Sequence, residues 1–276
     1  MWVLVVTKDG LFLLFLLHSE AKHKHGVEDC MVSFSIKIAG KIAAVHAFFE
    51  SSKDYCKAYL ISQAPDFTVT ISQEDLVMEK EKAAQTDRVE GKTVRDVTDA
   101  QLEITAIQRK IAQELVNHDT VLFHGSVVAV DGCAYLFTAK SGTGKSTHTR
   151  LWREMLGERA VMVNDDKPFL RVTEHEILAC GSPWNGKHRL GANMEVPLKG
   201  ICILERGAEN HITTMDPQDA LYMLLQQSNR PGGAKRLGKY LELVDRIAAS
   251  VPIYRLRCNM EPEAAMVSYR AMAKCE

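Results

Sequence analysis

The sequence predicts an α/β fold in which short apolar strands alternate with helices. The first observation is an apolar run, Cys133 to Phe137, followed by a glycine-rich loop and by helix-forming residues from Thr147 to Leu156, where Gly157 is a natural C-terminal cap. The second is another apolar run, Ala160 to Val163, which ends in carboxylates. Further strand patterns and amphipathic helices follow at 177–180, 200–204, 217–227 and 236–249.

The composition is that of ordinary globular material. The chain has 276 residues, of which 46% are hydrophobic and 25% charged, enough for one large core or a core plus a small domain. The formal net charge is −1 and no block of five or six like charges occurs, so nothing indicates a nucleic-acid partner. The seven cysteines form no C-x-x-C pair, which is typical of reduced thiols in the cytoplasm and gives no zinc site.

The chain divides into three predicted parts: 1–30, 31–118 and 119–276. The apolar run Leu11 to Leu17 is too short to cross a membrane, so no membrane partner is expected. We interpret residues 1–30 as a hairpin turning at Asp9-Gly10 or as a dispensable extension, with a start codon assigned too early as another alternative. An export signal is disfavoured because a basic start and a clear small-residue cleavage site are missing.

The second part, 31–118, reads as a small α+β segment that carries no catalytic constellation. The pattern predicts strands at 32–38 and 67–71, a turn at Gly40, a helix around 47–60 and a packing helix over 102–116.

The loop after Phe137 has the composition of a phosphate-binding loop. Two glycines permit backbone conformations in which successive N–H groups face one anion, and the following helix N-terminus adds partial positive charge. Lys145 would reach the β- and γ-phosphates, and the hydroxyl of Ser146 would bind a magnesium ion. Ala139 stands where the pattern G-x-x-x-x-G-K-[ST] begins with glycine, which is tolerable if that residue keeps a negative φ. The predicted phosphate-binding residues are Ser141, Gly142, Thr143, Gly144, Lys145, Ser146 and Thr147.

Two adjacent carboxylates, Asp165 and Asp166, follow the run Ala160 to Val163, as expected for the end of a neighbouring strand. Such carboxylates hold magnesium or accept a proton from an attacking hydroxyl. The alternative is a simple turn, since Asp-Asp-Lys-Pro is also good turn chemistry, and for an isolated pair that alternative would be preferred.

The glycine-rich and basic loop 181–193 offers cations for the same site. Lys187, His188 and Arg189 are available to neutralise charge on a transferring phosphoryl group. The alternative, three solvated side chains in a flexible loop, is at least as well supported.

The stretch from His124-Gly125-Ser126 through the loop to Asp165-Asp166 resembles the catalytic core of HPr kinase/phosphorylase and of its bacterial relatives. A wider resemblance is to the nucleotide-binding core of ATP-dependent phosphoenolpyruvate carboxykinase. The resemblance implies a phosphoenolpyruvate carboxykinase-like P-loop core, a mixed sheet flanked by helices, in which Lys145 binds phosphate of ATP and Ser146 binds Mg²⁺. It implies that Asp165 and Asp166 divide the base and metal roles, without saying which takes which. His124 falls near the active site by this resemblance, whereas a buried strand-end histidine is the alternative.

One departure from the family concerns the substrate. The residue after the lysine and serine is typically acidic in HPr kinases, whereas this chain has Thr147, so the same substrate is not implied. The resulting hypothesis is an ATP-dependent kinase that transfers the γ-phosphate to a hydroxyl acceptor, either a serine of a protein or peptide or a small molecule. The alternatives are a non-catalytic ATP-binding accessory or regulatory protein and, disfavoured by chain length, a carboxykinase-type enzyme.

Overall fold

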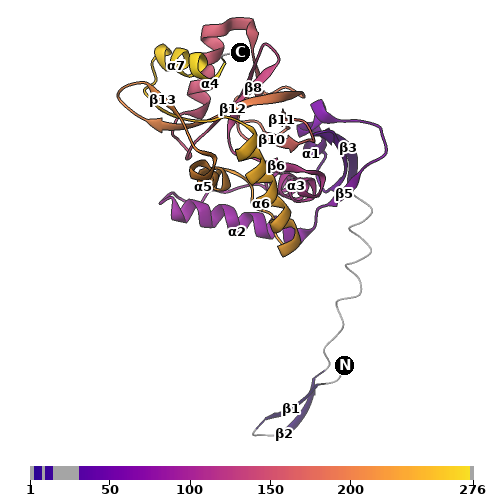
Figure 1. Cartoon of the computed structure of the whole chain (residues 1–276). Helices are drawn as coiled ribbons and strands as arrows, with labels where there is room; N and C mark the ends of the chain where they lie inside the picture. The colour runs from indigo at the N-terminus through magenta and orange to yellow at the C-terminus, as the bar shows by residue number, and fades with distance from the viewer. Residues whose placement is uncertain (1–2, 8–9, 15–30, 274–276) are drawn as a thin grey trace.

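The computed structural model describes residues 3–7, 10–14 and 31–273, and its architecture is mixed α/β (Figure 1). Strand β1 (Val3–Thr7) pairs antiparallel with β2 (Gly10–Leu14), with Thr7 opposite Gly10, in a separate two-stranded sheet. The predicted N-terminal hairpin is therefore present, although its expected turn residue Asp9 lies outside the described residues.

A nine-stranded mixed sheet forms the centre of the molecule. Its order is β6-β10-β11-β12-β8-β7-β9, with β14 also paired to β12 and β13 paired to β14. The strands are β6 (Thr120–Leu122), β7 (Ser126–Val130), β8 (Cys133–Thr138), β9 (Ala160–Asn164), β10 (Phe169–Val172), β11 (Ile177–Cys180), β12 (Glu195–Arg206), β13 (His211–Thr214) and β14 (Ile253–Cys258).

Strands β8 and β9 end at the same edge of the sheet, although they are not neighbours. The prediction that the strand before the Asp pair adjoins the strand before the glycine-rich loop is wrong, because β7 lies between them. Strand β7 pairs antiparallel with both, so β8 and β9 run in the same direction. Their carboxyl ends, and the loops that follow them, consequently lie on one side.

Helices cover both faces of this sheet. Helices α4 (Lys145–Leu156) and α7 (Pro262–Met272) pack on one face, and α5 (Pro217–Gln227) and α6 (Ala234–Ser250) on the other. Side chains of β7 and β8 alternate between the two cores, since Val127 and Leu136 face α5 and α6 whereas Val128 and Phe137 face α4 and α7. Short 3-10 turns occur at 57–59, 116–118 and 157–159.

A three-stranded sheet, in the order β3-β4-β5, forms a second layer with three helices. Its hydrophobic core is shared with the main sheet, because Leu122, Phe169 and Trp184 belong to the same cluster as Ile36 and Ile107. The elements are β3 (Val32–Ile38), β4 (Lys41–Ala47), α1 (Glu50–Tyr55), β5 (Phe67–Thr70), α2 (Gln73–Val89) and α3 (Asp99–Leu115).

The structure corrects the sequence prediction in this layer. The helix expected around 47–60 is present but shorter, since only Glu50–Tyr55 is α-helical and a 3-10 turn follows at 57–59. Strand β4, into which the chain turns back at Gly40, was not predicted. Helix α2 was not predicted because most of its residues are charged or polar, and Ser72 and Asp75 cap its start reciprocally. The strands 32–38 and 67–71 and the helix 102–116 are confirmed to within a few residues.

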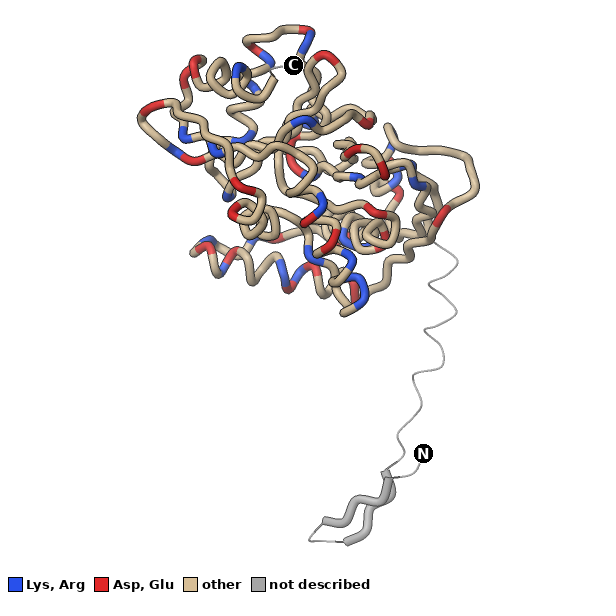
Figure 2. Tube along the Cα trace, in the orientation of Figure 1, with Lys and Arg blue, Asp and Glu red and all other residues tan. Residues whose placement is uncertain are grey.

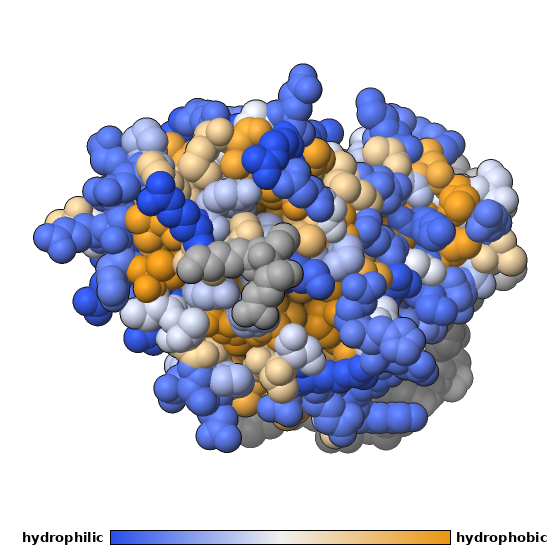
Figure 3. All heavy atoms as spheres, turned by 45° about the horizontal axis from the view of Figure 1, so that its top comes forward, coloured by the Kyte–Doolittle hydropathy of each residue, from blue (hydrophilic) through white to orange (hydrophobic). Residues whose placement is uncertain are grey.

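Lysine and arginine residues are interspersed with aspartate and glutamate over the traced chain (Figure 2). On the face turned forward in Figure 3, hydrophilic residues predominate and apolar ones show in patches between them. None of the helices in the described part of the chain combines the length and the apolar character needed to cross a membrane. The five cysteines within the described ranges, at 56, 133, 180, 202 and 258, are free thiols.

Candidate active site

The loop between β8 and α4 has the backbone of an anion cradle. Gly142 has a φ of +77° and Gly144 a φ of +121°, conformations that L side chains rarely adopt. A Cβ built on either glycine would meet no atom within 4 Å, so open space lies beside the loop. Ala139, by contrast, is not among the residues with positive φ, which explains why alanine is tolerated at the first position of the motif.

Lys145 lies at the first position of α4 and is 8% exposed. Its Nζ donates a hydrogen bond of 3.2 Å to the carbonyl of Ala139, so the side chain folds back across the loop. Burial lowers the pKa of Lys145, while the charges of Asp166 and Asp165 act to raise it. The amine is thus desolvated and lies near both carboxylates.

The Asp pair is placed by a buried asparagine at the end of β9. Asn164 Oδ1 accepts hydrogen bonds from the backbone N–H groups of Asp166 (2.9 Å) and Lys167 (2.7 Å), which sets a tight turn. Its Nδ2 donates to Ser182 Oγ at 3.0 Å, so the turn is fixed to the loop after β11. The turn interpretation of Asp-Asp-Lys-Pro is therefore right about the backbone, and it is this turn that presents both carboxylates.

The two carboxylates have different surroundings. Asp165 is 7% exposed, and its Oδ1 accepts a hydrogen bond of 2.7 Å from Ser126. The side chain of Asp166 is 39% exposed, and its Oδ1 lies 3.5 Å from His124 Nε2 and 4.0 Å from Lys167 Nζ. Asp165 is thus buried and hydrogen-bonded, whereas Asp166 is partly exposed in the cavity that both carboxylates line.

His124 is fixed beside Asp166 by its own backbone. The His124 carbonyl accepts from Thr138 Oγ1 at 2.8 Å, and the N–H of Gly125 donates to the Asp166 carbonyl at 3.0 Å. Burial, with the nearby charges of Lys167 and Lys145, lowers the pKa of His124 to about 4, so the imidazole is neutral at neutral pH. It can therefore take part in hydrogen bonding without adding charge.

These groups line one cavity of about 680 Å³. It brings together most of the predicted site residues, including Lys187, His188 and Arg189 from the loop after β11; Thr143 alone of the predicted set lies outside its lining. The lining comprises Tyr55, His124, Ser141, Gly142, Gly144, Lys145, Ser146, Thr147, Asp165, Asp166, Asn185, Gly186, Lys187, His188 and Arg189.

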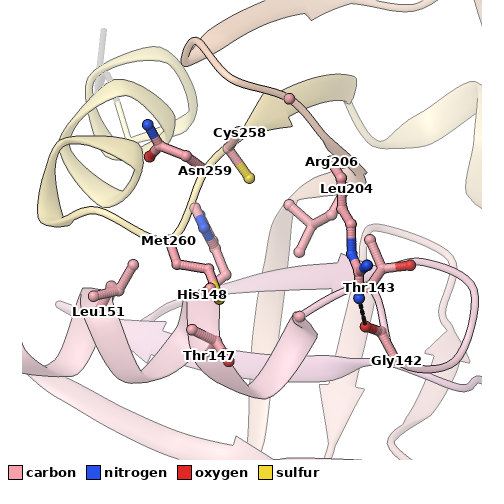
Figure 4. A pocket seen from close by; sticks show the side chains of 12 residues that line it. Gly142, Thr143, Thr147, His148, Leu151, Leu204, Arg206, Cys258, Asn259 and Met260 are labelled. Carbon is pink, nitrogen blue, oxygen red and sulfur yellow. Dashed lines mark hydrogen bonds between the residues drawn. The ribbon is translucent and has the colours of Figure 1, made fainter.

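A second cavity, of about 480 Å³, adjoins the other side of the loop (Figure 4). It shares Gly142, Gly144 and Thr147 with the first cavity and includes Thr143. Leu151, Leu204 and Met260 give it an apolar wall, and Arg206 donates a hydrogen bond of 2.7 Å to the Gly142 carbonyl. The phosphate loop thus lies between a polar cavity and a more apolar one.

Several of these residues were missed by sequence reasoning. Ser126 and Asn164 stand directly beside recognised residues, so their positions next to the His-Gly pair and the Asp pair were an available signal. Tyr55 and Arg206 gave no such signal, because Tyr55 lies at the end of α1 in the N-terminal segment and Arg206 at the end of β12, both far from the motif in sequence.

A magnesium site at Ser146 and the Asp pair is compatible with this donor set. Among the described residues, no group of three or more His, Cys, Asp or Glu side chains gathers as a metal cluster. Magnesium does not need one, because it commonly binds through one or two carboxylates together with phosphate oxygens and water.

Comparison with known proteins gives a distant likeness to solved structures. No protein-family model matches the chain, and no curated protein sequence matches it. The solved structure of the HPr(Ser) kinase/phosphatase from Coxiella burnetii is similar to it at 13% sequence identity, over 56% of this chain and 99% of that one, with a TM-score of 0.33.

Proposed function

We propose that this protein is an ATP-dependent kinase that transfers the γ-phosphate to a hydroxyl group, with Mg²⁺ as its metal. The observation that carries the proposal is that one cavity collects the phosphate loop, Lys145, the Asp pair and His124. A phosphate cradle alone would serve a binding protein equally well. Phosphoryl transfer needs a metal ligand and a base as well, and two carboxylates of different exposure in the same cavity can supply them.

The surroundings of the carboxylates divide their roles. Asp165 would hold magnesium with Ser146, because its Oδ1 is already bound to Ser126 and its orientation is fixed. Asp166 would be the general base, since it is partly exposed and faces neutral His124. In the transfer step Asp166 accepts the proton of the acceptor hydroxyl, the hydroxyl oxygen bonds to the γ-phosphorus, and the bond to the β-bridging oxygen breaks to release ADP.

The protein's own contribution is mostly positioning and charge. Lys145 and the N–H groups of the loop would neutralise the triphosphate, and magnesium supplies the further charge stabilisation such reactions need. The nucleoside would extend from Thr147 into the second cavity, where Leu151, Leu204 and Met260 offer an apolar surface for a base (Figure 4). Met260 is 75% exposed and lines this cavity, so its side chain is accessible to a ligand there.

The finer assignment is to a phosphoenolpyruvate carboxykinase-like core of the HPr kinase type. It is supported by the spacing of His124-Gly125, the loop and the Asp pair, and by their convergence at one edge of a mixed sheet. The test is incubation with ATP labelled at the γ-phosphate, in the presence of magnesium, with small-molecule and peptide hydroxyl acceptors. Label transferred by the wild type and not by Lys145→Ala supports the kinase; nucleotide binding without any turnover leaves the non-catalytic alternative.

A further inference from the structure

The N-terminal segment, residues 31–118, holds the loop that carries the cavity's cations. Trp184 Nε1 donates a hydrogen bond of 3.0 Å to the carbonyl of Ile104 on α3, and Asn193 Nδ2 donates one of 3.0 Å to the carbonyl of Ala58. The loop 181–193 is therefore attached to the segment near both of its ends. Its middle, with Lys187 and Arg189, lies along the cavity.

Between these attachments a third contact reaches into the cavity itself. The guanidinium carbon of Arg189 lies 4.7 Å from the centroid of the Tyr55 ring, and both residues line the cavity. Arg189 has a φ of +49°, in the left-handed region that a non-glycine residue seldom adopts. The backbone of Arg189 is therefore held in an uncommon conformation while its side chain lies over the Tyr55 ring.

The helix that ends at Tyr55 is held at its start by hydrogen bonds to Glu103. The buried carboxylate of Glu103 accepts hydrogen bonds from the backbone of Phe48 and Phe49 and from Ser52, at the start of the helix that ends at Tyr55. Burial raises the pKa of Tyr55, while the charge of Arg189 acts to lower it and that of Asp166 to raise it. The charges of Arg189 and Asp166 therefore both reach the Tyr55 hydroxyl.

Arg189 and Tyr55 lie on the polar side of the phosphate loop, apart from the apolar cavity proposed for the nucleoside. Lys145 lies at the phosphate loop, while Tyr55 and Arg189 line only the cavity that contains Asp166 and are absent from the apolar one. A guanidinium fork binds carboxylate or phosphate oxygens through two parallel hydrogen bonds, and an aromatic face beneath it fixes its plane.

We propose that Tyr55 and Arg189 form the acceptor end of the cavity, and that the acceptor carries a carboxylate or phosphate group besides the hydroxyl that is phosphorylated. The inference rests on the proposed kinase function and names its substrate class. Arg189 binds the oxyanion directly, and Tyr55 is a positioning residue that acts through Arg189. The N-terminal segment is then part of the substrate site rather than an appendage.

The test measures binding, so that it does not depend on knowing the natural acceptor. The full chain is saturated with Mg²⁺ and the non-hydrolysable β,γ-imido analogue of ATP, which fills the phosphate loop, and probes are added in calorimetry. The probes are 3-hydroxypropionate with its neutral partner 1,3-propanediol, and glycerol 1-phosphate with its neutral partner glycerol. We expect at least one anionic probe to bind tenfold or more tightly than its partner, and the preferred pair identifies carboxylate or phosphate.

The variants separate the roles of the two residues. Arg189→Gln should weaken the preferred anion tenfold or more, and Tyr55→Leu about two- to fivefold. Tyr55→Phe keeps the ring and should bind the anion as the wild type does, which a merely structural defect of Tyr55→Leu would not explain. Lys187→Gln, a neighbouring exposed cation that does not stack on Tyr55, should lose less affinity than Arg189→Gln.

Three results would overturn the proposal. They are an anion affinity no higher than that of the neutral partner, an equal loss in Lys187→Gln and Arg189→Gln, and a loss of nucleotide affinity in Arg189→Gln as large as the loss for the anion, which would place Arg189 on the triphosphate. Failure of the kinase proposal looks different, because the wild type would then either not bind the nucleotide analogue or, given ATP, transfer no phosphate to any hydroxyl acceptor, whether or not the anionic probe binds.

Discussion

The buried hydroxyl of Ser126 donates a hydrogen bond of 2.7 Å to Oδ1 of Asp165. Ser126 has no exposed surface, so this oxygen of the carboxylate is already occupied inside the protein and Oδ2 is left for a ligand. A Cβ on Gly186 would lie 3.2 Å from that Oδ2, which shows how closely the loop after β11 approaches it. The two adjacent aspartates therefore differ: Asp165 is buried and hydrogen-bonded to Ser126, whereas Asp166 is partly exposed.

The first prediction follows from this inequality. Asp166→Asn removes the proposed base, so phosphoryl transfer should fall about 10²- to 10⁴-fold while Mg-ATP affinity is largely kept. Asp165→Asn should instead raise the magnesium concentration needed for half-maximal activity. Steady-state rates measured against magnesium concentration distinguish the two. The reverse assignment, with transfer lost only in Asp165→Asn and the metal requirement shifted in Asp166→Asn, would show that the roles are exchanged.

The second prediction concerns the phosphate loop. If Lys145 binds phosphate, Mg-ATP at a hundred times its dissociation constant should stabilise the folded protein by about 2.7 kcal/mol, and Lys145→Ala should abolish the effect. Lys140→Ala is the matched control, because Lys140 lies in the same loop but is exposed and lines neither cavity beside it. Thermal unfolding with and without nucleotide is the measurement. Equal stabilisation of both variants would contradict the loop assignment.

The third prediction is a pH dependence set by His148. This imidazole is 3% exposed and bonded at 2.9 Å to Ser268 Oγ, and burial lowers its pKa from 6.5 to about 4. Below pH 6.5 the unfolded chain therefore binds a proton that the native state excludes, so stability is full above pH 6.5 and is lost as the pH falls toward 4. The loss is on the order of 3 kcal/mol.

His148→Gln isolates this contribution, because glutamine can still bond to Ser268 but does not titrate. Urea unfolding at a series of pH values should show a shallower loss of stability between pH 6.5 and 4 in the variant. The pKa of His124 is lowered in the same direction, so the difference between the two proteins, and not the wild-type slope alone, is the informative quantity. Parallel profiles would show that His148 is not the group responsible.

The local elements of the site could be predicted from the sequence, but most of the distant residues that line the cavity could not. The loop before Lys145 was predictable because strand, glycine turn and helix follow each other directly, and the structure shows the two glycines with positive φ. The neighbour relation of β8 and β9 was not, because strand order depends on β7, a fully buried strand that no alternation marks. Helix α2 was not predicted because it is mostly charged or polar and shows little apolar periodicity.

The contribution of Tyr55 could not have been found from sequence. It depends on α1 being short, on Glu103 of α3 accepting hydrogen bonds at the start of that helix, and on loop 181–193 returning to the same segment. The last two are contacts between residues far apart in the chain, and a single sequence does not show which distant residues come together.

The fourth prediction concerns the glycine beside His124. A Cβ on Gly125 would lie 2.5 Å from Leu136 Cδ1 and 2.9 Å from the carbonyl oxygen of Phe137, so the backbone of β8 would have to move. Gly125→Ala should therefore destabilise the protein by about 1–3 kcal/mol, as overpacked sites do. Because Gly125 N–H also bonds to the Asp166 carbonyl, the same shift should disturb the base and lower transfer more than nucleotide binding.

Gly238→Ala is the control for this variant. Gly238 lies exposed within α6, has no positive φ, and a Cβ there would meet nothing within 4 Å. Alanine should therefore stabilise this helix by about 0.5–1 kcal/mol. Urea unfolding gives both free energies, and transfer and nucleotide affinity measured on the same samples show whether the effect reaches the site. A Gly125→Ala protein as stable and as active as the Gly238→Ala protein would show that β8 accommodates the methyl group, and that the close approach of His124-Gly125 to β8 does not hold the base in place.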